Sequence, residues 1–118
     1  MSFTEILERV IIENNKINIR TLLFLGKEGD YFVVISPSIL VSGYGKTEPE
    51  ALESFQHNLK VFGQDVLSLK IDERNSYLES LGFLNHHTNF SRSYVDSKGI
   101  LQEFDAVEIK TQMIEAEI

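Results

Sequence analysis

The chain has 118 residues, 42% apolar and 25% charged, a composition typical of a single folded domain spanning residues 1–118. It contains no cysteine, which excludes disulfides, thiolate metal sites and cysteine nucleophiles. The net charge of −7 repels phosphate backbones, so we expect no direct contact with nucleic acid and, if a partner exists, a basic one. We find no apolar run long enough to span a membrane and no signal peptide, so we expect a cytoplasmic protein without membrane contacts.

The first residues favour a short helix over residues 2–11. Four apolar side chains share one helical face there: Ile6, Leu7, Val10 and Ile11. Ser2 and Glu5 have the spacing of a capping box, in which each side chain bonds the backbone N–H of the other residue. Asn14 and Asn15 are turn formers and end this element.

Three strands are expected next. Residues 17–25 alternate in hydrophobicity and place one set of side chains on a shared face: Ile17, Ile19, Thr21, Leu23 and Leu25. After a short glycine-containing loop, residues 31–35 are aromatic and β-branched and form the returning strand. Pro37 ends that strand because proline has no N–H to give to a ladder. Residues 39–42 form the third strand.

A long amphipathic helix follows from Thr47 to Leu69, and Gly43-Tyr44-Gly45 is the turn that leads into it. Apolar side chains recur at spacings of three and four residues and so form one stripe: Leu52, Phe55, Leu59, Phe62, Val66 and Leu69. Thr47 is a good N-cap, and Glu50 has the capping-box position. These elements predict an α+β fold, a three-stranded antiparallel meander packed on one long amphipathic helix, with extra helix or strand elements at both ends.

The same residues resemble the HicB-like antitoxin domain. The similarity lies in the glycine-aromatic strand Gly29 to Val34, the bend at Pro37, the turn Ser42 to Thr47 and the helix start Glu50-Ala51-Leu52. It covers residues 17–69, a HicB-like core. The resemblance implies a truncated ribonuclease-H-like fold without catalytic activity, and a small basic toxin ribonuclease as the partner. The family usually has an Asp-Leu-Pro-Gly bend where this chain has Pro37-Ser38-Ile39-Leu40.

HicB-type antitoxins often carry a DNA-binding module after this domain. Residues 83–118 contain only three cations, Arg92, Lys98 and Lys110, too few for a basic recognition helix. We therefore expect residues 70–118 to be a C-terminal extension without a DNA-binding module.

Two elements are expected early in that extension. Asp72 is placed to cap a helix that runs through Leu81, and Gly82 is placed to end it in a left-handed conformation. Residues 85–89 are polar and predict a loop.

The end of the chain is less determined. Residues 93–101 predict a hairpin with its turn at Asp96 to Gly99. The tail from Phe104 to Ile118 fits a helix and a strand equally well. A helix is favoured by capping-box spacing at Asp105 and Glu108, and a strand by the alternation of Val107, Ile109, Thr111 and Met113 with polar residues.

No catalytic, cofactor or metal site is predicted. A two-metal nuclease needs converging carboxylates, and the strand at 17–25 has none. His57 is isolated, and two adjacent histidines, His86 and His87, make a poor chelating pair. Candidates for a partner interface are Tyr31, Tyr44 and Tyr94, although half-buried strand and loop positions explain these tyrosines equally well.

Three functions remain open at this point. The first is a non-catalytic acidic binding module that sequesters a small basic toxin ribonuclease, with charge steering the encounter. The second is a stand-alone HicB-like domain that self-associates, as a homodimer, and has no toxin partner. The third is a small-molecule binder or enzyme whose site is assembled only in three dimensions.

Overall fold

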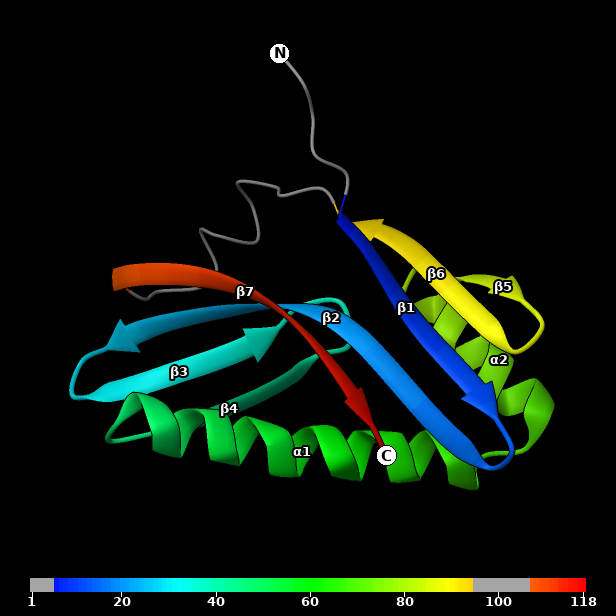
Figure 1. Cartoon of the computed structure of the whole chain (residues 1–118), viewed down its shortest axis with the longest axis horizontal. Helices are drawn as coiled ribbons and strands as arrows, with labels where there is room; N and C mark the ends of the chain where they lie inside the picture. The colour runs from blue at the N-terminus through cyan, green and yellow to red at the C-terminus, as the bar shows by residue number, and fades with distance from the viewer. Residues whose placement is uncertain (1–5, 95–106) are drawn as a thin grey trace, which may run out of the picture.

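A computed structural model describes residues 6–94 and 107–118, and the fold is that of these residues. It is α+β, as expected, and its sheet is antiparallel throughout (Figure 1). The elements in chain order are β1 (Ile6–Glu13), β2 (Lys16–Glu28), β3 (Tyr31–Ser36), β4 (Val41–Gly45), α1 (Glu48–Ser68), α2 (Ile71–Ser80), β5 (Leu84–His86), β6 (Asn89–Tyr94) and β7 (Val107–Glu117).

The sheet is larger than the sequence predicts. Strands β2, β3 and β4 follow one another as a meander, but they belong to a seven-stranded sheet with the order β4-β3-β2-β1-β6-β5 and with β7 paired to β2. The expected three-stranded sheet on one helix is therefore too small. The additional strands come from both ends of the chain, and β7 brings the C-terminus against the central strand (Figure 1).

Strand β2 is the centre of this sheet, because it is 13 residues long and pairs with three other strands, β1, β3 and β7. One edge pairs with β7 from Asn18 to Lys27. The other edge pairs with β1 from Lys16 to Arg20 and then with β3 from Phe24 to Glu28. Strands β1 and β3 thus leave β2 in opposite directions between Arg20 and Phe24, and we call this place the fork (Figure 1).

The expected helix at 2–11 is wrong, because residues 6–13 form β1; Ser2 and Glu5 lie outside the described residues. Along β1 every second side chain is buried: Glu8, Val10 and Ile12. That period of two suits a strand, and pairing with β2 and β6 satisfies the backbone on both edges. Asn14 and Asn15, with φ of 52° and 60°, form the two-residue turn that such hairpins favour.

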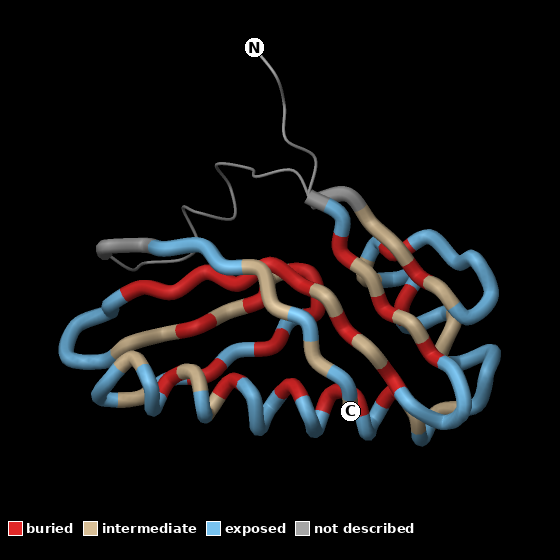
Figure 2. The backbone as a smooth tube through the Cα atoms, in the orientation of Figure 1, coloured by how far each residue is buried: buried red, intermediate tan, exposed pale blue. Residues whose placement is uncertain are grey.

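Helix α1 is confirmed, and so is its cap. Thr47 Oγ1 accepts a hydrogen bond from the N–H of Glu50 at 3.2 Å. The Glu50 carboxylate accepts from the N–H of Lys46 at 3.0 Å, one residue earlier than a standard capping box requires. Its buried stripe faces the sheet, and the opposite side of the helix is exposed (Figure 2). The stripe consists of Ala51, Phe55, Leu59, Phe62, Gly63 and Val66.

Most of the core lies between α1 and the sheet. The face of β2 that the sequence predicts is buried there, with Ile17, Ile19, Leu23 and Leu25 at most 6% exposed. Leu22 and Phe24, on the other face of β2, are buried as well. Strand β2 is therefore covered on both faces over this stretch, which explains its nearly continuous apolar sequence.

Gly43, Tyr44 and Gly45 lie in β4 and do not form the expected turn. The two glycines face α1 at very close range: a Cβ built on Gly43 would lie 2.2 Å from the backbone nitrogen of Phe55, and one on Gly45 would lie 2.5 Å from Cβ of Glu50. The Gly-x-Gly pattern therefore lets a strand approach a helix backbone directly, which any larger residue would prevent.

The second half of the chain differs from expectation in two places, and the structure decides a third that the sequence left open. Lys70, not Asp72, is the N-cap of α2, and Gly82 adopts the expected left-handed conformation after it, with φ of 95°. The expected loop at 85–89 is the β5–β6 hairpin. The ambiguous tail forms the strand β7 from residue 107 onward. The expected hairpin turn at 96–99 and the alternative cap at Asp105 lie outside the described residues.

Helix α2 covers the β5–β6 side of the sheet (Figure 1). Its Leu78 is fully buried, and the centre of its Tyr77 ring lies 6.2 Å from the centre of the Phe62 ring in α1. Arg74 of α2 donates to the carbonyls of Val66 and Leu67, at 3.3 and 3.2 Å. Because the last carbonyls of a helix lack intrahelical partners, this arginine also stabilises the end of α1. No helix of the described part is long and apolar enough to cross a membrane.

Candidate functional sites

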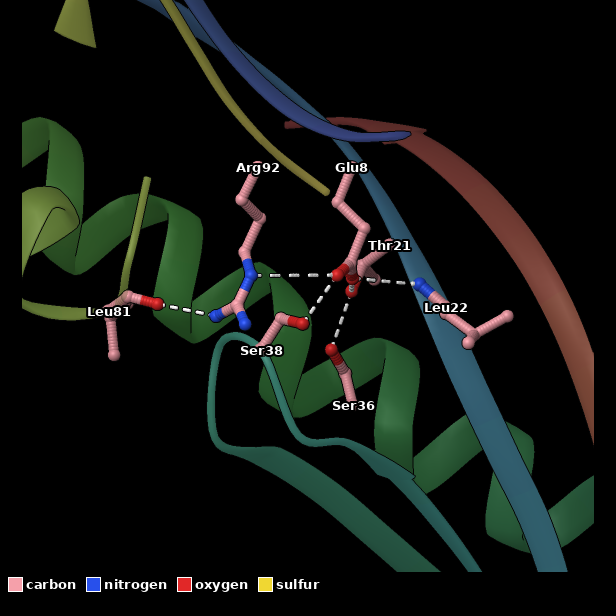
Figure 3. A network of polar contacts seen from close by, with 7 residues as sticks. All are labelled: Glu8, Thr21, Leu22, Ser36, Ser38, Leu81 and Arg92. Carbon is pink, nitrogen blue, oxygen red and sulfur yellow. Dashed lines mark hydrogen bonds and ion pairs between the residues drawn. The ribbon is translucent and has the colours of Figure 1, made fainter. Parts of the chain in front are cut away.

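A fully buried carboxylate, Glu8, occupies the fork (Figure 3). Its Oε2 accepts hydrogen bonds from Thr21 Oγ1 at 2.6 Å and from the backbone N–H of Leu22 at 3.0 Å. Its Oε1 accepts from Ser38 Oγ at 2.5 Å. The N–H of Leu22 points to the edge of β2 where neither β1 nor β3 reaches. The carboxylate therefore completes the backbone pairing at the one gap in this edge.

The hydroxyls around Glu8 form a short chain with a defined direction. Thr21 gives its single proton to Glu8, so in its 2.6 Å contact with Ser36 it must be the acceptor and Ser36 the donor. Thr21 and Ser36 are fully buried, and Ser38 is 4% exposed. These four side chains connect β1, β2, β3 and the turn that follows β3.

Arg92 of β6 supplies the opposite charge. Its Nε lies 4.0 Å from Glu8 Oε1, an ion pair without a hydrogen bond. Its Nη1 donates to the carbonyl of Leu81 at 2.5 Å, just after α2, and its guanidinium lies 6.0 Å from the centre of the Phe83 ring. Arg92 thus ties the end of α2 to the fork (Figure 3).

The polar cluster at the fork has a structural role, and solutes cannot reach it. Glu8, Thr21 and Ser36 have no exposed surface, so no solute can reach the carboxylate without opening the sheet. The sequence reasoning missed this cluster because it placed residues 2–11 in a helix. A period of two through Glu8, Val10 and Ile12 was the signal that could have revealed it.

Two of the three candidate interface tyrosines come together on the surface. Tyr31 at the start of β3 and Tyr44 in β4 are 45% and 69% exposed, and their rings pack edge to face with centres 6.2 Å apart. They lie on the sheet face that α1 does not cover, because the buried Val34 marks the covered face of β3. Val33 and Ile35 are half-buried on the same face as the tyrosines. The side chain of Tyr94 lies outside the described residues.

The two long edges of the sheet differ. On β4, the helix α1 closes the outer edge: Asn58 Nδ2 donates to the carbonyl of Ser42 at 2.7 Å, and Ser54 Oγ accepts from the N–H of Tyr44 at 3.3 Å. On β7, no described strand pairs with the outer edge. A groove of about 980 Å³ runs between β7 and α1, lined on the helix side by Leu59, Lys60 and Leu67 among others.

The three histidines are exposed and come from α1 and the β5–β6 hairpin. Among the residues that the structure describes, no three His, Asp or Glu side chains lie close enough together to hold a metal ion.

Comparisons of the chain with protein-family models, with curated proteins and with solved structures find no match. What this protein binds must therefore be inferred from the surfaces described above.

Proposed function

We propose that this protein is a non-catalytic, acidic binding module of the HicB-like type, which sequesters a small basic toxin ribonuclease in the cytoplasm. The observation that carries the proposal is the exposed pair of Tyr31 and Tyr44 on the open face of the sheet. The succession β2, β3, β4, α1 over the HicB-like core at 17–69 agrees with the order that the resemblance implies.

An exposed aromatic pair beside half-buried aliphatic side chains suits a protein interface. Tyrosine combines a large apolar ring with a polar hydroxyl and carries much of the binding energy in protein interfaces. The edge-to-face contact already holds the two rings in place, so little side-chain freedom is lost when a partner covers them. The net charge of −7 would accelerate the encounter with a basic partner.

Burial removes Glu8 from the candidate catalytic residues. It is the carboxylate with the most hydrogen-bond partners in the described part of the chain, and its three hydrogen bonds join β1 to β2 and to the turn after β3. An acid or base catalyst must come within hydrogen-bond distance of its substrate, which a carboxylate with no exposed surface cannot do.

The test is affinity purification of the tagged protein from its native host, followed by mass spectrometry. We expect a small basic protein in a stoichiometric complex that dissociates as salt is raised. The Tyr31→Ala/Tyr44→Ala variant should bind this partner at least about tenfold more weakly, because each lost interface tyrosine is typically worth about 1 kcal/mol or more.

The matched control is Leu84→Ala, which removes an apolar side chain that is 65% exposed on β5, far along the sheet order from β4. It should leave binding unchanged. Recovery of this chain alone would refute the antitoxin proposal. Recovery of a basic partner whose affinity the tyrosine variant does not change would refute the tyrosine surface alone.

A further inference from the structure

We infer that the outer edge of β7 pairs with the same edge of a second copy of this chain, antiparallel, so that two sheets join into one. This interface goes beyond the proposed function, because it requires no toxin and lies on the edge of β7, not on the sheet face that carries Tyr31 and Tyr44.

Along its outer edge, the backbone of β7 presents a regular row of groups that no described strand pairs with. Ile17 and Ile118 exchange both backbone hydrogen bonds, at 3.1 and 2.8 Å. This pair shows which residues of β7 direct their backbone groups toward β2. Even-numbered residues of β7 therefore bond to β2, and the N–H and C=O groups of Thr111, Met113 and Glu115 point outward. A long strand edge of this kind is a template for another strand.

The other edges of the described sheet are protected. Asn58 and Ser54 of α1 occupy the outward carbonyl and N–H of β4, as described above. Strand β5 is only three residues long. Short strands and side-chain bonds are the usual means by which proteins prevent edge pairing. Strand β7 has 11 residues, and among residues 6–94 and 107–118 no side chain bonds to its outward backbone groups.

The charges along β7 allow two copies of this strand to pair antiparallel. A two-fold axis through Gln112, Met113 or Ile114 gives three possible registers, and none places like charges opposite each other. With the axis at Met113, Thr111 lies opposite Glu115 and Lys110 lies opposite Ala116. Moving the axis to Lys110 or to Glu115 would oppose two identical charges, so the axis is confined to the residues between these two.

The groove beside β7 fits the side chains of the second copy. In a continuous sheet, the alternate side chains of the added strand lie on the α1 side, where the groove of about 980 Å³ is available. In β7 these are Gln112, Ile114 and Ala116, the last two apolar and half-buried in a single copy. Leu59 and Leu67 line the opposite wall, so pairing buries apolar surface as well as backbone.

The test is the solution mass of the purified full chain across a concentration series, by sedimentation equilibrium. We expect twice the mass of one 13.5 kDa chain. Met113→Pro removes an outward N–H on each copy and leaves the bonds to β2 intact. It should weaken the dimer at least about 100-fold, since two symmetric bonds are lost at about tenfold each. Met113→Ala is the matched control: it keeps the N–H and should remain dimeric.

Cross-linking gives a second measurement that does not depend on the folding of the proline variant. The chain has no cysteine, so single cysteines can be placed in separate variants at Gln112, Met113 and Ile114, with Glu53→Cys on the exposed side of α1 as control. Mild oxidation should produce a disulfide dimer quickly at the position on the two-fold axis and slowly at Glu53.

Two results would overturn the inference. One is a monomeric wild-type chain at about 100 μM, a concentration at which even a weak micromolar dimer is populated. The other is a dimer in which none of the three β7 cysteines cross-links faster than the one at Glu53. Neither result bears on toxin binding, so the proposed function is tested separately.

Discussion

Replacing Glu8 by alanine is the most direct test of the fork. The substitution removes the acceptor for Thr21, Leu22 and Ser38 at once and leaves Arg92 without its ion pair. The hydroxyl hydrogens of Thr21 and Ser38 can rotate once the carboxylate is gone. The N–H of Leu22 cannot, because it points to the edge of β2 between β1 and β3 where no strand pairs.

The size of the effect follows from these contacts. A buried N–H without a partner costs about 1–3 kcal/mol. Removing one member of a buried ion pair typically costs about 3–5 kcal/mol, and we use the lower part of that range because the Arg92 side chain is 27% exposed and keeps some water. The two costs overlap because both arise from the loss of one carboxylate, so they are not added. We therefore expect Glu8→Ala to lower the free energy of unfolding by about 3–4 kcal/mol, a large part of the roughly 5–15 kcal/mol that holds a typical domain folded.

Urea denaturation followed by far-ultraviolet circular dichroism measures this change. At a slope of about 2 kcal/mol/M, the midpoint should fall by about 1.5–2 M. Glu13→Ala is the matched control, an exposed carboxylate on the same strand, and should change stability by less than about 0.5 kcal/mol. A loss below about 1 kcal/mol for Glu8→Ala would show that the carboxylate does not complete the pairing of β2.

Three further predictions follow from local geometry and use the same denaturation assay. Glu8→Gln keeps the shape and one acceptor oxygen but brings an amide N–H₂ toward the Ser38 hydroxyl and the Arg92 cation, so it should cost about 1–2 kcal/mol, clearly less than Glu8→Ala. Gly43→Ala places a Cβ 2.2 Å from the Phe55 nitrogen and should cost about 3 kcal/mol, whereas Ser42→Ala on the exposed face should be neutral. Leu40→Asn should raise stability by about 0.5–1 kcal/mol, because Leu40 is 75% exposed and has a φ of 58° that asparagine tolerates better; a loss would mean that the leucine side chain itself stabilises the turn.

Local sequence patterns were sufficient to predict an element wherever its apolar residues followed one clear helical or strand period. The stripe of α1 and its cap at Thr47, the alternation of Ile17 to Leu25, and the end of β3 at Pro37 were all predicted from spacing and from the chemistry of single residues. These features depend on groups within a few residues of each other, so the sequence contains all the information they need.

The prediction was wrong for β1 and undecided for β7, and both are strands formed by distant pairing. Residues 6–13 satisfy a helical face about as well as an alternating one, and their partners β2 and β6 decide between the two. The tail becomes a strand because it pairs along one edge of β2, which lies far earlier in the chain; Asn18, for example, pairs with Glu117. The Gly-x-Gly of β4 likewise has its reason in α1, and not in a turn.

By itself the sequence determined the α+β class, the long capped helix and the acidic charge, and it suggested Tyr31, Tyr44 and Tyr94 as candidate interface residues. Tertiary structure alone decided that β2 would be shared by three strands and that Glu8 would fill the fork between two of them. It also decided that α1 would close one sheet edge, whereas no described strand pairs with the other. The physical reason is that backbone hydrogen bonds in a sheet join residues far apart in sequence. The side-chain pattern of a segment therefore does not reveal which strand its backbone will pair with, or along which edge.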